Sequence, residues 1–124
     1  MDLLKHIKSI SEPSASHFGE EFGVNMVQED NLYQFKYMQL SAKWDYKLTH
    51  ESRGVILRKD GSHWRVASRP FDKFFNQHEG HCPVFDEDQF KALAKNMEFH
   101  EKADGTCIQM WYDDEQDKWR ASTL

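Results

Sequence analysis

Apolar residues recur at two spacings along this chain of 124 residues, and the spacings distinguish helices from strands. Near the start, four apolar residues follow helical spacing and predict an amphipathic helix over residues 2–10: Leu3, Leu4, Ile7 and Ile10. A second helix is predicted from Asp86, because acidic residues fill its first turn and Asp86 with Gln89 matches a capping box. Four residues form its expected buried stripe: Phe90, Leu93, Ala94 and Met97.

Alternating apolar and polar residues predict strands elsewhere in the chain. The clearest run is 31–40, with three aromatic residues on one face: Tyr33, Phe35 and Tyr37. A short strand is expected at 22–27, and residues 55–57 and 63–68 flank Asp60-Gly61 as a hairpin. A further hairpin is expected from strands at 106–112 and from 119 onward. Residues 14–21 are expected to be loop, 41–52 irregular, and Phe71, Phe74 and Phe75 to pack around Lys73.

The composition indicates one folded α+β domain, since 39% of the residues are hydrophobic and 14% are aromatic. No apolar run approaches the roughly 20 residues of a membrane span, and no secretory signal follows Met1, so no membrane partner is expected. Two cysteines are too few for a disulfide framework, which favours a cytoplasmic protein with both thiols reduced. The sequence carries no signal for an oligomeric state.

The net charge is −5, but residues 53–73 hold six basic side chains against two acidic ones, a local charge of +4. The basic residues are Arg53, Arg58, Lys59, Arg65, Arg69 and Lys73. This stretch is a candidate anion site, and a solvated strand face is the alternative interpretation.

The stretch Glu101-Lys102-Ala103-Asp104-Gly105-Thr106 carries the candidate chemistry. Alternation from Phe99 to Asp104 predicts a strand that turns at Gly105, and a strand end would hold Lys102 rigidly. A lysine becomes a good nucleophile when cationic neighbours or desolvation favour its neutral amine. Gly105 would let the backbone approach a ligand closely. The alternative is a solvated lysine beside an ordinary Asp-Gly turn.

Three stretches would form a nucleotide site if they converged on Lys102. Arg53 and Lys73 offer positive charge for phosphates, and Phe75 (or Phe74) offers a flat face for a base. Taken singly, Arg53 could pair with a surface carboxylate, and the phenylalanines could belong to the core.

Two clusters of potential metal ligands are better explained without a metal. His78, His81 and Cys82 could hold zinc together with His100 or Cys107, but a polar loop is the favoured interpretation. Asp113, Asp114, Glu115 and Asp117 lack the glycine and the spacing of a calcium loop, so a solvated turn is favoured.

Several runs together closely resemble the phage-type ATP-dependent RNA ligases, the RNA ligase 1 family. These runs are Glu51-Ser52-Arg53-Gly54-Val55-Ile56, Asp60-Gly61, Val66-Ala67-Ser68-Arg69-Pro70, Lys73-Phe74-Phe75-Asn76 and Lys102-Ala103-Asp104-Gly105. The last resembles nucleotidyltransferase motif I, and the aromatic strand from Leu32 to Trp44 is also similar. The resemblance runs from about residue 30 to the end, and the stretch from Arg69 to Asn76 is its most specific part.

The resemblance implies an antiparallel-sheet nucleotidyltransferase core (ATP-grasp-like, shared by ligases and capping enzymes) and RNA repair with ATP and Mg²⁺. In this family the lysine matching Lys102 attacks ATP to form lysyl-AMP; AMP then passes to an RNA 5′-phosphate, and an RNA 3′-hydroxyl displaces it. Carried over by position, Arg53 and Lys73 contact the nucleotide, Phe75 stacks on the base and Gly105 lies beside it. Glu51 matches an acidic position assigned to nucleotide binding.

The family's later motifs are missing, so residues 1–124 are expected to be a truncated amino-terminal portion of the adenylyltransferase domain that adenylates poorly alone. Two other interpretations stay open: another covalent nucleotidyltransferase, such as a DNA ligase or a capping guanylyltransferase, or a non-catalytic nucleotide- or RNA-binding module.

Overall fold

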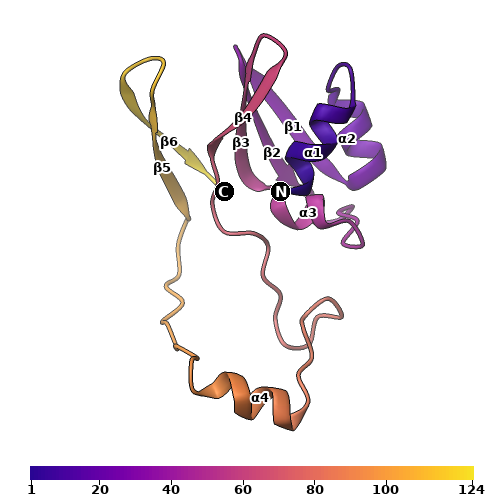
Figure 1. The fold of residues 1–124 in the computed structure, drawn as a ribbon, viewed down its shortest axis with the longest axis vertical. Helices are drawn as coiled ribbons and strands as arrows, with labels where there is room; N and C mark the ends of the chain where they lie inside the picture. The colour runs from indigo at the N-terminus through magenta and orange to yellow at the C-terminus, as the bar shows by residue number, and fades with distance from the viewer. The chain divides into compact units, whose positions relative to one another are not determined.

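The computed structural model describes all residues, 1–124, and divides them into two units (Figure 1). The first unit combines Met1–Lys73 with Thr106–Leu124, and the second is Phe74–Gly105. The first unit is therefore assembled from two separate stretches of the chain. No helix of the structure is both long and apolar enough to cross a bilayer.

A four-stranded antiparallel sheet forms the centre of the first unit. Its strands lie in the order in which they occur in the chain: β1 (Val24–Glu29), β2 (Leu32–Tyr37), β3 (Arg53–Asp60) and β4 (His63–Ser68). The alternation along β2 and β3 sends successive side chains to opposite faces, so each face can pack against a different layer. Phe35 lies opposite Val55 in the register, and both belong to the same core.

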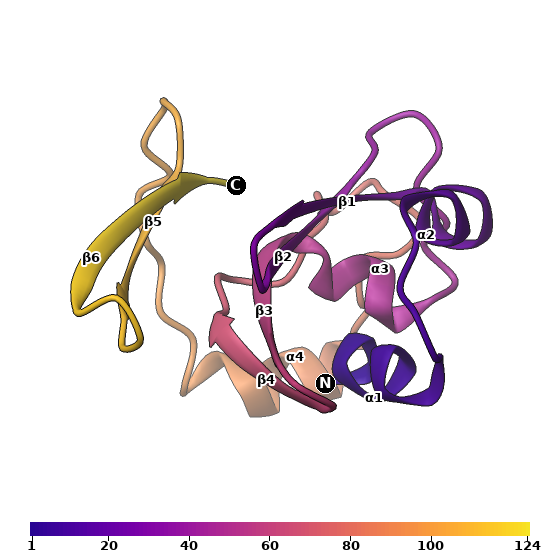
Figure 2. The ribbon, with the colours of Figure 1, turned by 90° about the horizontal axis from the view of Figure 1, so that it is seen from above.

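Helices cover one face of this sheet: α1 (Asp2–Ser9), α2 (Ala15–Phe22) and the short α3 (Lys47–Glu51) (Figure 2). Leu3 and Ile7 of α1 and Phe18 of α2 are fully buried there. They pack with the odd-numbered residues of β2 and β3, such as Phe35 and Leu57, in the main hydrophobic core. Burial of this apolar surface is the main force that holds the helices on the sheet.

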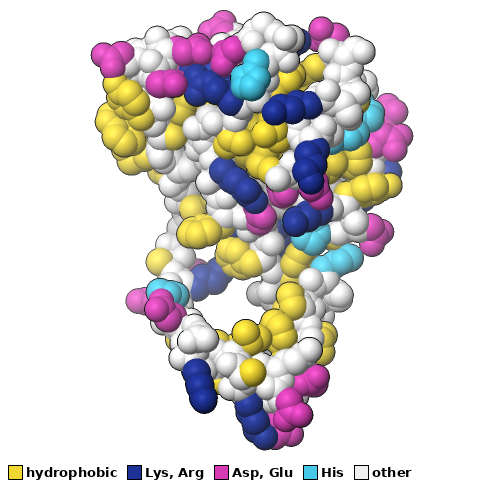
Figure 3. All heavy atoms as spheres, in the orientation of Figure 1, with side chains coloured by type: hydrophobic (Ala, Val, Ile, Leu, Met, Phe, Trp, Pro, Cys, Tyr) yellow, Lys and Arg dark blue, Asp and Glu magenta, His cyan; other side chains and the backbone are white.

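The opposite face of the sheet carries a second hairpin, β5 (Ile108–Asp113) and β6 (Lys118–Thr123) (Figure 2). Trp111 packs there with Leu32 and Ile56 in a smaller core. The outward face of the hairpin is apolar and exposed, as Figure 3 shows along its edge, and its large residues are Ile108, Met110, Tyr112 and Trp119.

The second unit contains one helix, α4 (Glu87–Ala94), and otherwise no regular secondary structure. The side chain of Asp86 accepts a hydrogen bond from the backbone N–H of Gln89, and the side-chain oxygen of Gln89 accepts one from the backbone N–H of Asp86. The predicted capping box is confirmed.

The expected α+β class, the helix at 2–10, the strand at 31–40 and both hairpins are confirmed, with ends that differ by a few residues. The predicted loop at 14–21 is wrong, because Ser14 caps α2, Gly23 ends it in a left-handed conformation, and Phe18 and Phe22 share its buried face. The short strand expected at 22–27 begins only at Val24. The irregular stretch 41–52 contains α3.

Two predictions about the region from 85 to 105 are also wrong. Residues 99–104 form no strand, since no neighbouring strand pairs with them. No residue of α4 is buried, and Phe90, Leu93 and Met97 keep between 36% and 51% of their surface exposed.

The expected aromatic packing around Lys73 fails for Phe71, whose side chain is 78% exposed.

Candidate nucleotide-binding site

Arg53 begins β3 directly after α3, and its partner in the antiparallel register is Lys36 of β2. The two residues bring a guanidinium and an ammonium group to one end of the sheet, where they line a pocket of about 220 Å³. The other residues that line it are Tyr37, Gln39, Ser52, Gly54, Cys107 and Leu124. Two cations in a small polar pocket suit an anion such as a phosphate.

The β5–β6 hairpin closes this pocket from the side opposite the sheet. The backbone N–H of Leu124 donates to the carbonyl of Cys107, and Lys36 Nζ donates to Thr123 Oγ1 over 3.1 Å. Gly54 has φ of 88°, and a Cβ at this position would lie 3.0 Å from Leu124 Cδ2. A side chain at position 54 would therefore be strained by the positive φ and would crowd Leu124.

Gln109 holds the hairpin against the sheet beside the pocket. Its buried side-chain amide donates to the carbonyl of Gly54 and to Ser122 Oγ, and its oxygen accepts from Ser68 Oγ at 2.8 Å. One side chain thus links β3, β4, β5 and β6, which fixes the start of β5 near Arg53.

Lys73 is connected to the same pocket through two aromatic rings. Its backbone N–H donates to the carbonyl of His50 at 2.8 Å, and its ammonium lies 6.0 Å from the centre of the Trp44 ring. Trp44 in turn packs edge-on against Tyr37, with 4.9 Å between ring centres, and Tyr37 lines the pocket. Within the first unit, Lys73 is therefore connected by these ring contacts to the pocket that Arg53 lines.

Glu51 has a structural contact that the sequence did not reveal. Its side chain is 2% exposed, and its carboxylate accepts hydrogen bonds from the backbone N–H groups of Asp2 and Leu3, at 3.0 and 2.9 Å. These are orphan donors at the N-terminus of α1, where a negative charge is favourable. A contact between Glu51 and a nucleotide stays a prediction.

The other predicted site residues belong to the second unit. The ring of Phe75 lies 5.5 Å from that of His81, Lys102 is exposed, and Gly105 has φ of 140°. The convergence of Phe75, Lys102 and Gly105 with Arg53 and Lys73 stays a prediction.

The expectation of a broad anion site across residues 53–73 is wrong for its middle, because acidic residues of the β5–β6 turn neutralise the arginines. Arg58 is 1% exposed, and its guanidinium lies 2.7 Å from Asp113 Oδ1 and 3.0 Å from Asp114 Oδ1. Arg65 lies 2.9 Å from the same Asp114 carboxylate, and these contacts raise its pKa above the ordinary value. Lys59 pairs with Glu12, and Arg69 with Asp72.

The acidic β5–β6 turn was expected to be solvated, but one of its carboxylates is buried. Asp113 is fully buried; burial alone would raise the pKa of its carboxyl, but hydrogen bonds from Arg58 and the backbone of Gln116 hold that pKa down at about 2. Arg120 Nε lies 2.7 Å from the second carboxylate oxygen. Alternation along this strand does not predict the burial, since the other face, with Ile108, Met110 and Tyr112, is the more apolar one and is exposed.

No group of three or more histidine, cysteine, aspartate or glutamate side chains in the structure is arranged to hold a metal ion. Both cysteines, Cys82 and Cys107, are free thiols.

The family model described as RNA ligase matches residues 51–123. An RNA ligase of Rhodothermus phage RM378 is 34% identical over 139 residues, covering 98% of this chain and 31% of the phage protein. A putative bifunctional polynucleotide kinase/RNA ligase of Autographa californica nuclear polyhedrosis virus is 34% identical over 99 residues, covering 77% of this chain and 14% of the viral protein.

No solved structure matches the chain. The chain spans less than a third of the length of either relative. The family match includes Arg53, Gly54 and Cys107, which line the Arg53 pocket, and the Lys102 motif between them in the chain. On this evidence of sequence, the chain belongs to the RNA ligase family.

Proposed function

We propose that this chain forms the nucleotide-binding part of an ATP-dependent RNA ligase and that Lys102 is its covalent nucleophile. The family match over residues 51–123 supports the proposal, because it includes every residue assigned a role: Glu51, Arg53, Lys73, Phe75, Lys102 and Gly105. The antiparallel sheet would then be part of a nucleotidyltransferase core.

The observation that carries the proposal is the pocket that Arg53 shares with Cys107. Cys107 follows Lys102 by five residues, and five extended residues span at most about 18 Å. The proposal requires the amine of Lys102 to come within reach of a phosphate bound beside Arg53.

In the proposed first step, the neutral amine of Lys102 attacks the α-phosphorus of ATP. A nitrogen–phosphorus bond forms, the bond to the bridging oxygen breaks, and pyrophosphate leaves while the amine loses its proton. Arg53 and Lys73 would bind the phosphates, and their positive charge favours the neutral form of a neighbouring amine. Phe75 would stack on the adenine.

The second and third steps transfer the nucleotide and join the strands. An oxygen of the RNA 5′-phosphate attacks the adenylate phosphorus and releases Lys102, which gives an RNA end capped by AMP. The 3′-hydroxyl of the second strand then attacks the RNA phosphate and displaces AMP. Gly105 would allow the backbone to approach the nucleotide.

Magnesium is proposed to enter with the ATP phosphates, whose charge it neutralises during phosphoryl transfer. The described residues do not themselves form a site for it: no carboxylate cluster is present, and the Glu51 carboxylate binds the α1 N-terminus. We therefore assign no step to a protein-bound metal ion.

Intact-mass measurement tests the proposal. The natural polypeptide that contains this sequence, incubated with ATP and Mg²⁺, is expected to gain one adenylate. Lys102→Ala should abolish the gain, whereas Lys95→Ala, which removes another exposed lysine of the second unit, should leave it intact. An unmodified parent protein, or an adduct that persists in Lys102→Ala, would refute the proposal.

Labelling and strand-joining assays on the same protein distinguish the ligase from the rival functions. A capping guanylyltransferase would take its label from GTP, and a DNA ligase would join DNA ends in preference to RNA ends. A non-catalytic module would bind nucleotide without forming an acid-stable adduct.

A further inference from the structure

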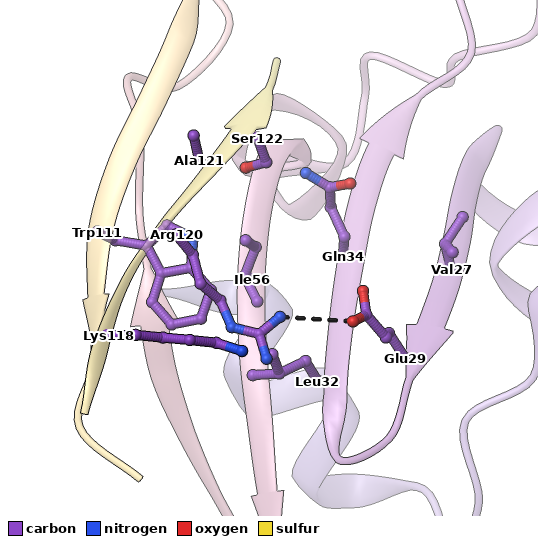
Figure 4. A pocket seen from close by; sticks show the side chains of 10 residues that line it. All are labelled: Val27, Glu29, Leu32, Gln34, Ile56, Trp111, Lys118, Arg120, Ala121 and Ser122. Carbon is purple, nitrogen blue, oxygen red and sulfur yellow. Dashed lines mark hydrogen bonds and ion pairs between the residues drawn. The ribbon is translucent and has the colours of Figure 1, made fainter. Parts of the chain in front are cut away.

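A second pocket, of about 310 Å³, lies between the sheet and the β5–β6 hairpin, inside the first unit (Figure 4). Its size is at the lower end of pockets that hold small ligands. Ten residues line it, among them Leu32, Gln34, Ile56, Trp111, Lys118 and Arg120. Neither Lys73 nor Arg53 is among them, so it is distinct from the proposed ATP pocket.

The floor of this pocket is apolar. Leu32, Ile56 and Trp111 are each at most 7% exposed and form one cluster. The indole N–H of Trp111 is buried and has no hydrogen-bond partner. Because protein atoms enclose this N–H, a ligand in the pocket would meet the apolar surface of the floor and not this donor.

Two cationic side chains of β6 reach the mouth of the pocket. Figure 4 shows the long side chains of Lys118 and Arg120 extending side by side toward Leu32. The guanidinium of Arg120 lies 5.8 Å from the centre of the Trp111 ring and 3.4 Å from Glu29 Oε1. No acidic group pairs with Lys118.

The positive charge of Lys118 and Arg120 at the mouth of the pocket therefore favours the binding of an anion. Glu29 is 75% exposed, and such a surface ion pair contributes little, so a bound anion could displace its carboxylate from Arg120. The inner side of Arg120 stays anchored by buried Asp113, which holds the guanidinium in place over the ring.

We propose that this pocket binds a nucleoside phosphate, with its base on the apolar floor and its phosphate between Lys118 and Arg120. Gln34 and Ser122, at the other end of the pocket, carry the amide and hydroxyl groups that could contact base edges. The ligand is either a free mononucleotide or one unpaired nucleotide of an RNA strand. Neither alternative requires Lys102 to be a nucleophile.

NMR of the four tryptophan indole N–H signals tests the proposal directly. AMP is expected to shift the Trp111 signal in a saturable way and to leave that of Trp64, on the opposite face of the sheet, unchanged. Adenosine alone and inorganic phosphate alone should each bind more weakly than AMP, because each lacks half of the contacts. A short oligoadenylate RNA that binds more tightly than AMP would identify the RNA strand as the source.

Lys118→Ala should weaken the binding of AMP roughly fivefold, as expected for one partly exposed ion pair. With the RNA, the same change should reduce the slope of log affinity against log salt by about 0.7–1. Lys47→Ala removes an exposed lysine of α3 outside the pocket and should change neither quantity.

Two results would overturn the proposal: a Trp111 signal that stays fixed at millimolar AMP, or a Lys118→Ala variant that binds as tightly as the parent. Arg53→Ala separates this inference from the proposed ligase chemistry. It should impair ATP binding at the first pocket and leave the Trp111 response to AMP intact.

Discussion

Replacement of Asp113 by asparagine removes the buried negative charge on which Arg58 and Arg120 converge. The carboxylate lies 2.7 Å from a nitrogen of each guanidinium and accepts backbone N–H groups of Glu115 and Gln116, both at 3.2 Å. Asparagine keeps the volume and can still accept from the backbone. It leaves the 1%-exposed Arg58 without a buried counter-ion.

The expected loss of stability is large for a single isosteric change. Removal of one partner of a buried ion pair costs about 3–5 kcal/mol, because the remaining charge is desolvated and uncompensated. Domains of this size are stable by about 5–15 kcal/mol in total. A loss of about 4 kcal/mol lowers the ratio of folded to unfolded protein roughly a thousandfold.

Urea denaturation at pH 7, followed by tryptophan fluorescence and circular dichroism, measures this loss. Asp114→Asn is the matched control, since Asp114 also contacts Arg58 but is 60% exposed, and it should cost less than about 1 kcal/mol. The double variant Arg58→Met/Asp113→Asn should be less destabilised than the sum of its single variants. If Asp113→Asn stays within about 1 kcal/mol of the parent, the buried pair does not hold the hairpin on the sheet as argued.

Three further predictions concern stability. Glu51→Gln should destabilise by about 1–2 kcal/mol in urea denaturation, because it removes the charge at the α1 N-terminus; an unchanged midpoint would contradict the capping role. Gly54→Ala should cost about 2 kcal/mol or more through its positive φ and the contact with the hairpin, whereas Gly80→Ala, in open space, should cost far less. Stability should fall in two pH ranges as the solution is acidified. The first lies below about 6.5, because burial, and to a smaller extent His17, lowers the pKa of His6. The second lies between about 4 and 2, where Asp113 becomes protonated. Urea midpoints across pH check this, and His6→Gln should remove only the upper range.

The sequence predicted those elements whose signals are local. Alternation in 31–40 and the Asp60-Gly61 turn each require only neighbouring residues, and both are confirmed. The helix from Ala15 was missed because its polar composition hid a Ser14 cap and a Phe18/Phe22 pair. Lys102 was placed in a strand from alternation alone, but a strand also needs a partner, which this pattern cannot reveal.

Contacts between distant segments could not be predicted from composition. The local charge of +4 suggested an open cationic surface, yet Arg58 lies 55 residues from Asp113 and is neutralised by it. Arg53, at the start of the same strand, lines a pocket. Only the three-dimensional pairing of β3 with the second hairpin distinguishes these two arginines.

The first unit is closed by a segment that returns after a 32-residue excursion, from Phe74 to Gly105. The entropy of closing such a loop grows only logarithmically with its length, so doubling the excursion would cost roughly 0.6 kcal/mol. Insertions or deletions inside that excursion should therefore be tolerated by the sheet, its two pockets and the buried ion pairs. Evolution could lengthen or shorten the segment that carries the lysine while the first unit stays the same.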